Sequence, residues 1–208
     1  MRKLLSYLAA ILFLLTSMAF LPQSALAAFA ERPVGFVVMD HTGDVDGAMY
    51  KSLRSMVKMP YHFPDYKIID GGLPQQVVSD VLRDDVKVDK KLMAALAEKS
   101  KVDVLVVARI YAMDERMVHG WIGSWEDNDT YIAIEASADF FVYKKDGDKF
   151  LKKRLREREV KEMGNSEDPR ELVKWALSDI VNDMERSEEH TSELQSLEDL
   201  VCRLLLEK

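Results

Sequence analysis

The chain has 208 residues, of which 36 are acidic and 29 basic, and its formal net charge is −7. This length corresponds to one ordinary domain or two small ones. A hydrophobic content of 48% beside 31% charged residues excludes wholesale disorder. The acidic balance argues against a nucleic-acid-binding protein, because the chain has no net positive field to displace counterions.

The first 28 residues have the pattern of a secretory signal peptide. Arg2 and Lys3 precede an uncharged apolar stretch over residues 4–21, and the Ala-Leu-Ala of residues 25–27 matches a cleavage site. An uncleaved membrane anchor is the alternative, because the apolar stretch approaches the roughly 18 residues that span a membrane. No cysteine stands near the cut, so we expect no lipid anchor. We therefore predict an exported protein, periplasmic or secreted, that contacts the membrane only through its signal peptide. Cleavage is expected after Ala27, Ala28 or Ala30.

The last 23 residues, 186–208, resemble the in-frame translation of a sequencing-library adaptor. Residues 186–196 match the adaptor's first part and residues 200–208 its distal part. A native amphipathic tail is the alternative, but we expect a foreign segment, disordered or a stray helix, that plays no part in the fold. The only cysteine, Cys202, lies in it, so the remaining chain has neither disulfides nor thiol chemistry. Whether the native chain continues beyond Glu185 is left open.

Residues 29–185 are predicted to form a single α/β domain. The apolar positions alternate with a period of two in the expected strands and recur every three or four residues in the expected helices. In chain order we expect a strand at 34–39, a helix with apolar residues over 45–57, a strand at 66–69, helices over 77–82 and 92–96, strands at 102–113, 130–143 and 150–163, and a helix over 172–184.

Several local signals arrange these elements into a mixed sheet. Residues 104–108 are apolar on both faces, which is typical of a central strand. A turn at residues 145–148 joins the last two strands as a hairpin, and the charged strand 150–163 suits an edge, where Lys and Arg discourage pairing with other chains. Asp89 is the expected cap of the helix with apolar residues over 92–96, and Asp168 is a helix cap before Pro169. We predict a three-layer-type domain, with about five strands, a C-terminal antiparallel meander and helices packed on the sheet.

The best polar cluster is the turn after the first strand, which carries Asp40, His41, Asp44 and Asp46. Ligands often bind where such a strand leads into a helix. A calcium loop fails here, because Leu53 stands where a bidentate Glu is required. Capping of the following helix by Asp44 or Asp46 is the simpler interpretation. An exported hydrolase or metal-dependent enzyme centred on this turn is the alternative.

Two loops are candidates for partner binding. Trp121 and Trp125 lie beside glycines between two long strands, where they form either a contact surface or a cover folded back onto the sheet. His62 and Phe63 lie in a second loop. Residues 144–158 are locally basic, which a solvated hairpin explains as well as an anionic partner does. We find no catalytic triad, phosphate loop or metal-ligand spacing, and expect no catalytic residue, cofactor or metal.

The order of elements, together with export, resembles a superfamily of bacterial envelope proteins. It includes the curli-secretion component CsgG, the penicillin-binding-protein activator LpoB and the amino-terminal domain of TolB. The similar stretches are residues 34–39, 66–70 and 97–108, then the meander with its Asp-Gly turn and the final helix.

This resemblance implies a non-enzymatic module for protein docking or assembly, whose partner is an envelope protein or a cell-wall component. It carries over no functional residue. A small-ligand-binding protein is a further alternative, and the sequence leaves the oligomeric state open.

Overall fold

The computed structural model describes residues 31–82, 86–119, 130–162 and 168–186. The elements lie in one of the two units into which the chain divides, Arg32–Lys208. They are β1 (Arg32–Asp40), α3 (Gly47–Lys58), β2 (Tyr66–Asp70), α4 (Gly72–Val81), α5 (Lys90–Ser100), β3 (Val104–His119), β4 (Thr130–Lys144), β5 (Lys149–Glu162) and a helix over residues 169–186.

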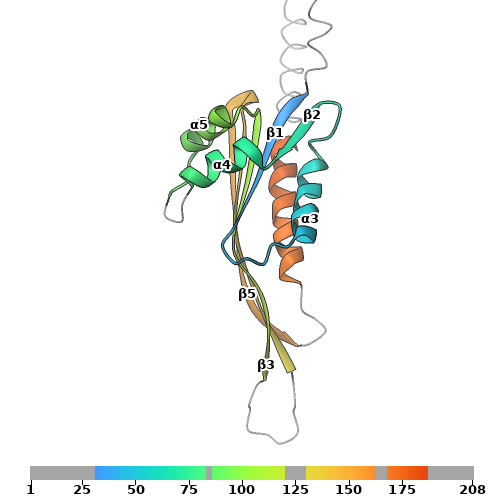
Figure 1. Cartoon of the computed structure of the whole chain (residues 1–208). Helices are drawn as coiled ribbons and strands as arrows, with labels where there is room; N and C mark the ends of the chain where they lie inside the picture. The colour runs from blue at the N-terminus through green and yellow to red at the C-terminus, as the bar shows by residue number, and fades with distance from the viewer. Residues whose placement is uncertain (1–30, 83–85, 120–129, 163–167, 187–208) are drawn as a thin grey trace, which may run out of the picture. The chain divides into compact units, whose positions relative to one another are not determined.

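The five strands form one mixed sheet in the order β2-β1-β3-β4-β5 (Figure 1). β1 runs parallel to β2 and β3, and β3, β4 and β5 form an antiparallel meander. β3 lies in the middle, and residues 104–108 are fully buried, as their apolar character on both faces predicted. β5 lies at the edge, which confirms the interpretation of its charged sequence.

Helices cover both faces of the sheet, which confirms the three-layer-type architecture. α3 and the helix 169–186 lie on one side, and α4 and α5 on the other (Figure 1). The alternation of β4 decides which side chains enter which core. Ile132 to Val142 at every second position point to the α3 side and are buried, whereas Phe141 and Tyr143 enter the smaller core under α4 and α5.

Residues at three turns start or join these elements as predicted. The Asp89 side chain accepts a hydrogen bond from Leu92 N (2.8 Å) at the start of α5. The Asp168 side chain accepts one from Arg170 N (2.8 Å) at the start of the last helix. Gly147 in the β4–β5 turn has a φ of 72°, a conformation that costs glycine little.

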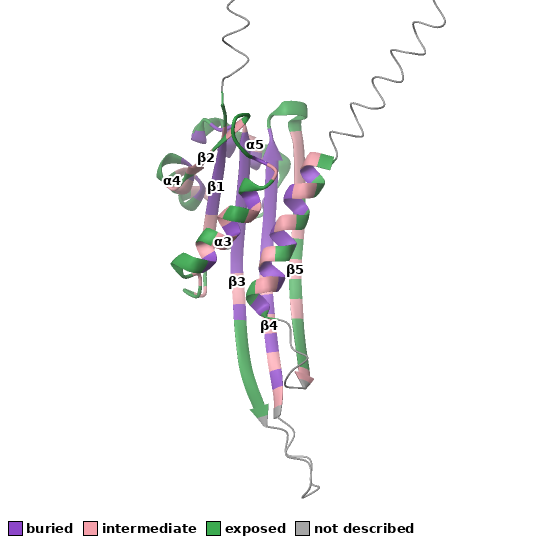
Figure 2. Cartoon of the chain, turned by 90° about the vertical axis from the view of Figure 1, so that its right-hand side faces the viewer, coloured by how far each residue is buried: buried purple, intermediate pink, exposed green. Residues whose placement is uncertain are grey.

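β3 is longer than predicted. It runs on to His119 rather than ending near Met113, because its pairing with β4 continues through Asp114 opposite Glu135 and beyond. The polar residues that appeared to end the strand are exposed on a part of the meander that extends past the helices (Figure 2). There the ladder of backbone hydrogen bonds, not burial, maintains the strand.

Two expectations about the ends of the chain lie outside the described residues. These are the signal peptide, 1–28, and all but the first residue of the tail 186–208. Within the described ranges, no helix has both the length and the apolar character needed to cross a membrane.

Candidate functional site

The polar turn after β1 is held together by Asp40. Its Oδ1 accepts hydrogen bonds from Thr42 N, Thr42 Oγ1 and Gly43 N at 2.7–3.0 Å, and its Oδ2 accepts one from Val45 N at 2.9 Å. Burial acts to raise the pKa of this carboxyl, but these hydrogen bonds outweigh it and hold the pKa below its usual range. The carboxylate is therefore already engaged in shaping the turn.

Asp46 caps the helix that follows this turn. Its Oδ1 accepts a hydrogen bond from Met49 N at 2.7 Å, and its Oδ2 pairs with Arg170 Nη1 at 3.2 Å. The hydrogen bond from Met49 N is the main cause that lowers the pKa of Asp46. Between the two predicted caps, Asp44 and Asp46, the structure selects Asp46. Across the described ranges, no three His, Cys, Asp or Glu side chains gather in a way that suits a metal ion.

Replacing Asp46 by alanine should lower the melting temperature by about 3 °C, because the first turn of α3 loses the acceptor of an otherwise unpaired N–H group. Asp44→Ala is the matched control, since Asp44 is exposed and is not the cap. It should leave the midpoint within about 1 °C. Thermal unfolding followed by circular dichroism measures both. Equal shifts for the two variants would contradict the capping role.

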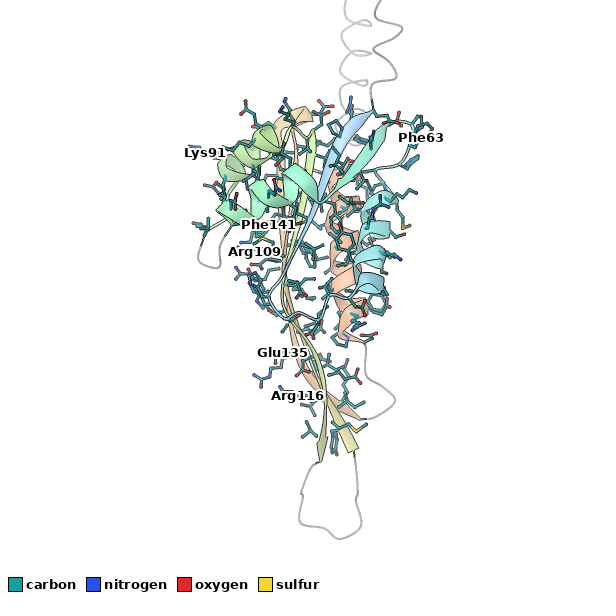
Figure 3. All side chains as sticks on the ribbon, viewed as in Figure 1. Phe63, Lys91, Arg109, Arg116, Glu135 and Phe141 are labelled. Carbon is teal, nitrogen blue, oxygen red and sulfur yellow. The ribbon has the colours of Figure 1, made fainter. Side chains whose placement is uncertain are left out.

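The predicted loop residues do not join this turn. Phe63 is 73% exposed, follows α3 and lies toward the opposite end of the sheet from Arg116, with Arg109 between them along the sheet (Figure 3). His62 precedes it, and the His62 backbone carbonyl accepts a hydrogen bond from Tyr66 N. Trp121 and Trp125 lie outside the described residues, so their role in partner binding stays a prediction.

His41, in contrast, lies beside a cluster of charged residues that the strands bring together. Its ring stacks on Tyr111 with 5.3 Å between the centroids. Tyr111 occupies the irregularity in the pairing of β3 with β4, between Ile110 and Ala112. This extra residue places the Tyr111 ring on the α4/α5 side of the sheet, next to Asp139.

Asp139 is the centre of this cluster, which we call the arginine cluster: Arg109, Tyr111, Asp139, Arg154 and Arg156. Asp139 is only 5% exposed, and its Oδ1 accepts hydrogen bonds from Arg154 Nε (3.1 Å) and Arg156 Nη2 (3.2 Å). Arg109 pairs directly with Asp139 in the β3–β4 register and is buried. Two guanidinium groups thus contact one carboxylate, and that of Arg109 lies 5.7 Å from the neighbouring Tyr111 ring, so the cluster has a local excess of positive charge.

Tyr111 completes the arginine cluster as a hydrogen-bond donor. Burial is the main cause that raises the pKa of its phenol; the positive charge of Arg109 opposes this and the carboxylate of Asp139 adds to it. The hydroxyl therefore stays protonated and donates to Asp139 Oδ2 at 3.4 Å. The guanidinium groups of Arg109 and Arg156 lie 5.7 Å and 5.1 Å from the ring centroid, within the range of cation–π attraction.

The arginine cluster continues into a larger basic surface. We call it the basic face. It is the α4/α5 side of β3, β4 and β5, and it extends along the sheet from Lys152 and its cross-strand neighbours to Val160 and its cross-strand neighbours. α4 and α5 cover the sheet only above it (Figures 1 and 2). Its charged side chains are six basic residues and three acidic ones, Arg109, Arg116, Lys152, Arg154, Arg156 and Arg158 against Asp114, Glu135 and Asp139.

Strand alternation gathers four basic residues of β5 on one face. Those at 152, 154, 156 and 158 point to the basic face and are exposed, whereas the other side carries both signs of charge, with Lys149, Lys153, Glu157, Glu159 and Lys161. At the far end of the basic face lies a shallow cavity of about 530 Å³. Its lining includes two arginines, two glutamates and three small apolar side chains: Arg116, Arg158, Glu135, Glu159, Val118, Ala133 and Val160. The face thus offers charge along its length and an apolar patch at its end.

Sequence reasoning found β5 and His41 but missed the arginine cluster. The signal was present as the alternating Lys and Arg of residues 152–158, which we interpreted as protection of an edge. What the sequence did not indicate is that β3 and β4 place Arg109, Tyr111 and Asp139 beside them, because that proximity depends on register.

Comparison with known proteins gives structural similarities alone. No family model matches the chain, and no curated protein matches it. The structure is similar to the PelC dodecamer from Paraburkholderia phytofirmans (6% identity, 73% of this chain and 85% of that one, TM-score 0.37). It is also similar to the hypothetical protein CT253 from Chlamydia trachomatis (13%, 74% and 96%, 0.40) and to lipoprotein GNA1162 from Neisseria meningitidis (12%, 74% and 99%, 0.32).

Of these three neighbours, GNA1162 is a lipoprotein by name. Their TM-scores lie below 0.5. We therefore base no argument about function on them. The narrower resemblance to CsgG, LpoB and TolB stays a prediction, and no function of this chain follows from the neighbours.

Proposed function

We propose that this protein is an exported, non-catalytic module of a bacterial cell envelope that docks a negatively charged partner on its basic face. The observation that carries the proposal is this excess of positive charge on a chain whose net charge is −7. Charge complementarity of this kind steers an acidic partner to one surface and repels it from the others. Arginine and tyrosine are also the side chains enriched where proteins bind one another.

The arginine cluster favours docking over a merely solvated edge. A solvated edge requires only exposed charges. Here Asp139 and Arg109 are buried, and the Tyr111 hydroxyl donates a hydrogen bond to Asp139. Hydrogen bonds to Asp139 restrict Arg154 and Arg156, although their side chains are 59% and 44% exposed. Side chains that are ordered before binding lose less conformational entropy when a partner arrives.

The alternative functions have less support in the described residues. An enzyme centred on Asp40 and Asp46 would need carboxylates that are available to a substrate or metal. Both carboxylates already accept hydrogen bonds from the backbone, and the carboxylate of Asp46 also pairs with Arg170. Docking through Trp121 and Trp125 stays a separate prediction that is compatible with the proposal.

The test is binding of fluorescent poly-L-glutamate, a soluble anionic polymer, measured by anisotropy at low ionic strength. The double variant Lys152→Glu and Arg158→Glu should weaken this binding by about tenfold or more, because two positive charges of the face become negative. Neither residue contacts the buried Asp139 carboxylate, so the arginine cluster stays intact. Affinity should also fall as salt rises, since exposed charges are screened beyond about 10 Å at 0.1 M ionic strength.

The matched control is Lys51→Glu with Lys58→Glu, two exposed positions of α3 on the other side of the sheet. It changes the net charge by the same amount, so a general charge effect would weaken binding equally in both variants. Equal weakening, or no binding by the unchanged protein, would refute docking on the basic face.

A further inference from the structure

We infer that the partner presents an extended acidic strand that pairs with the outer edge of β5. This inference deepens the proposed function and rests on it. It adds the form of the bound segment, a peptide that extends the sheet by one strand, and its composition, acidic residues at alternate positions. Addition of a strand to a sheet edge is an established mode of peptide recognition.

β5 provides an edge of the required length. It is a 14-residue strand and the last in the sheet, and the described residues pair it with β4 alone. Such an edge presents a row of backbone N–H and C=O groups in the direction away from β4. A typical strand of about six residues uses less than half of it. The backbone of β5 therefore supplies hydrogen bonds for an added strand, and the side chains decide which strand is accepted.

The side chains of β5 specify an acidic strand. Lys152, Arg154, Arg156 and Arg158 occupy every second position and point to the same face. An added strand would place its own alternate side chains about 5 Å from them, and pairs of opposite charge at that spacing stabilise a sheet. Glutamate or aspartate at every second position matches all four. The apolar patch beyond Arg158, with Ala133 and Val160, suits an apolar residue at one end of the segment.

The same charges argue against a second copy of this chain as the occupant. Antiparallel pairing of two β5 edges in one continuous sheet would place Lys and Arg opposite Lys and Arg on the basic face. Like charges directly opposite each other destabilise strand pairs. Basic side chains on this edge strand thus disfavour a basic strand, and opposite charge makes an acidic strand the favoured partner.

The test uses fluorescent peptides of about nine residues in which glutamate and threonine alternate. Two further peptides carry N-methyl groups on alternate amides, one on the odd and the other on the even positions. Both keep the full charge, but each loses the donors along one edge of the extended peptide only. If the peptide pairs with β5, one methylated peptide should bind about tenfold more weakly or worse, and the other should bind nearly as well as the parent.

Hydrogen exchange of the protein supplies a second readout, since bound peptide should slow exchange of the outward amides of residues 150–160. Equal binding by both methylated peptides, without slower exchange in β5, would overturn strand addition. Poly-L-glutamate would still bind in that case, so the proposed anion-docking function would survive. Failure of the polymer and of all three peptides would instead refute the proposed function itself.

Discussion

Replacement of Glu185 by alanine is expected to lower the free energy of unfolding by about 3 kcal/mol. Glu185 lies near the end of the helix 169–186, and its Oε1 is 3.0 Å from Lys144 Nζ. The Lys144 side chain is only 1% exposed and lies at the end of β4, with its ammonium 5.6 Å from the centroid of the Tyr66 ring. The Lys144 ammonium is almost wholly removed from water, so loss of a carboxylate that compensates its charge is costly.

The control for this variant is Asp179→Ala. Asp179 lies on the same helix and pairs with Lys153 of β5 at 2.8 Å, but both side chains are substantially exposed. An exposed ion pair contributes about 0–1 kcal/mol, because water compensates for its loss. Urea denaturation of both variants measures the difference. If Glu185→Ala loses no more than Asp179→Ala does, the buried pair does not hold this helix against the sheet.

Replacement of Leu177 by alanine is expected to cost about 3 kcal/mol of stability. Leu177 is fully buried in the larger core, between the helix 169–186 and the α3 side of the sheet. Its truncation removes apolar contacts and leaves a cavity that rigid strands close only in part. Urea denaturation should show a lower midpoint with an unchanged slope, the sign of a native structure that is weakened but not rearranged.

Trp175 on the same helix is the matched control. Its side chain is larger than that of Leu177 but 54% exposed. Trp175→Ala should therefore change stability by less than about 1 kcal/mol. A larger loss from Trp175→Ala than from Leu177→Ala would mean that the helix presents a different face to the sheet from the one described.

Local sequence patterns were sufficient for most of the fold. Alternation in residues 130–143 identified β4 and the face that it buries, and the caps Asp89 and Asp168 located two helix starts. These features depend on interactions between residues close in the chain, so the sequence expresses them directly. The end of β3 was predicted wrongly because Asp114 and its neighbours form a strand through pairing with β4, without burial.

The polar turn shows how far such reasoning extends toward a site. The sequence identified Asp40, His41, Asp44 and Asp46 as its polar residues, and it left capping and catalysis as alternatives. The structure assigns Asp46 to the cap and Asp40 to the turn, because hydrogen-bond distances distinguish residues that composition does not. The structure also stacks the His41 ring on Tyr111, a contact that no local pattern indicated.

The sequence by itself determined the class of this protein: an acidic chain with an export signal pattern and one α/β domain whose charged last strand forms an edge. Only the tertiary structure decided where the charges of that strand meet others. Arg109 and Asp139 lie in strands separated along the chain, and they meet Arg154 because the register of three strands aligns them in one row. Register is a property of pairing between distant segments, and a shift by one residue would send every one of these side chains to the opposite face.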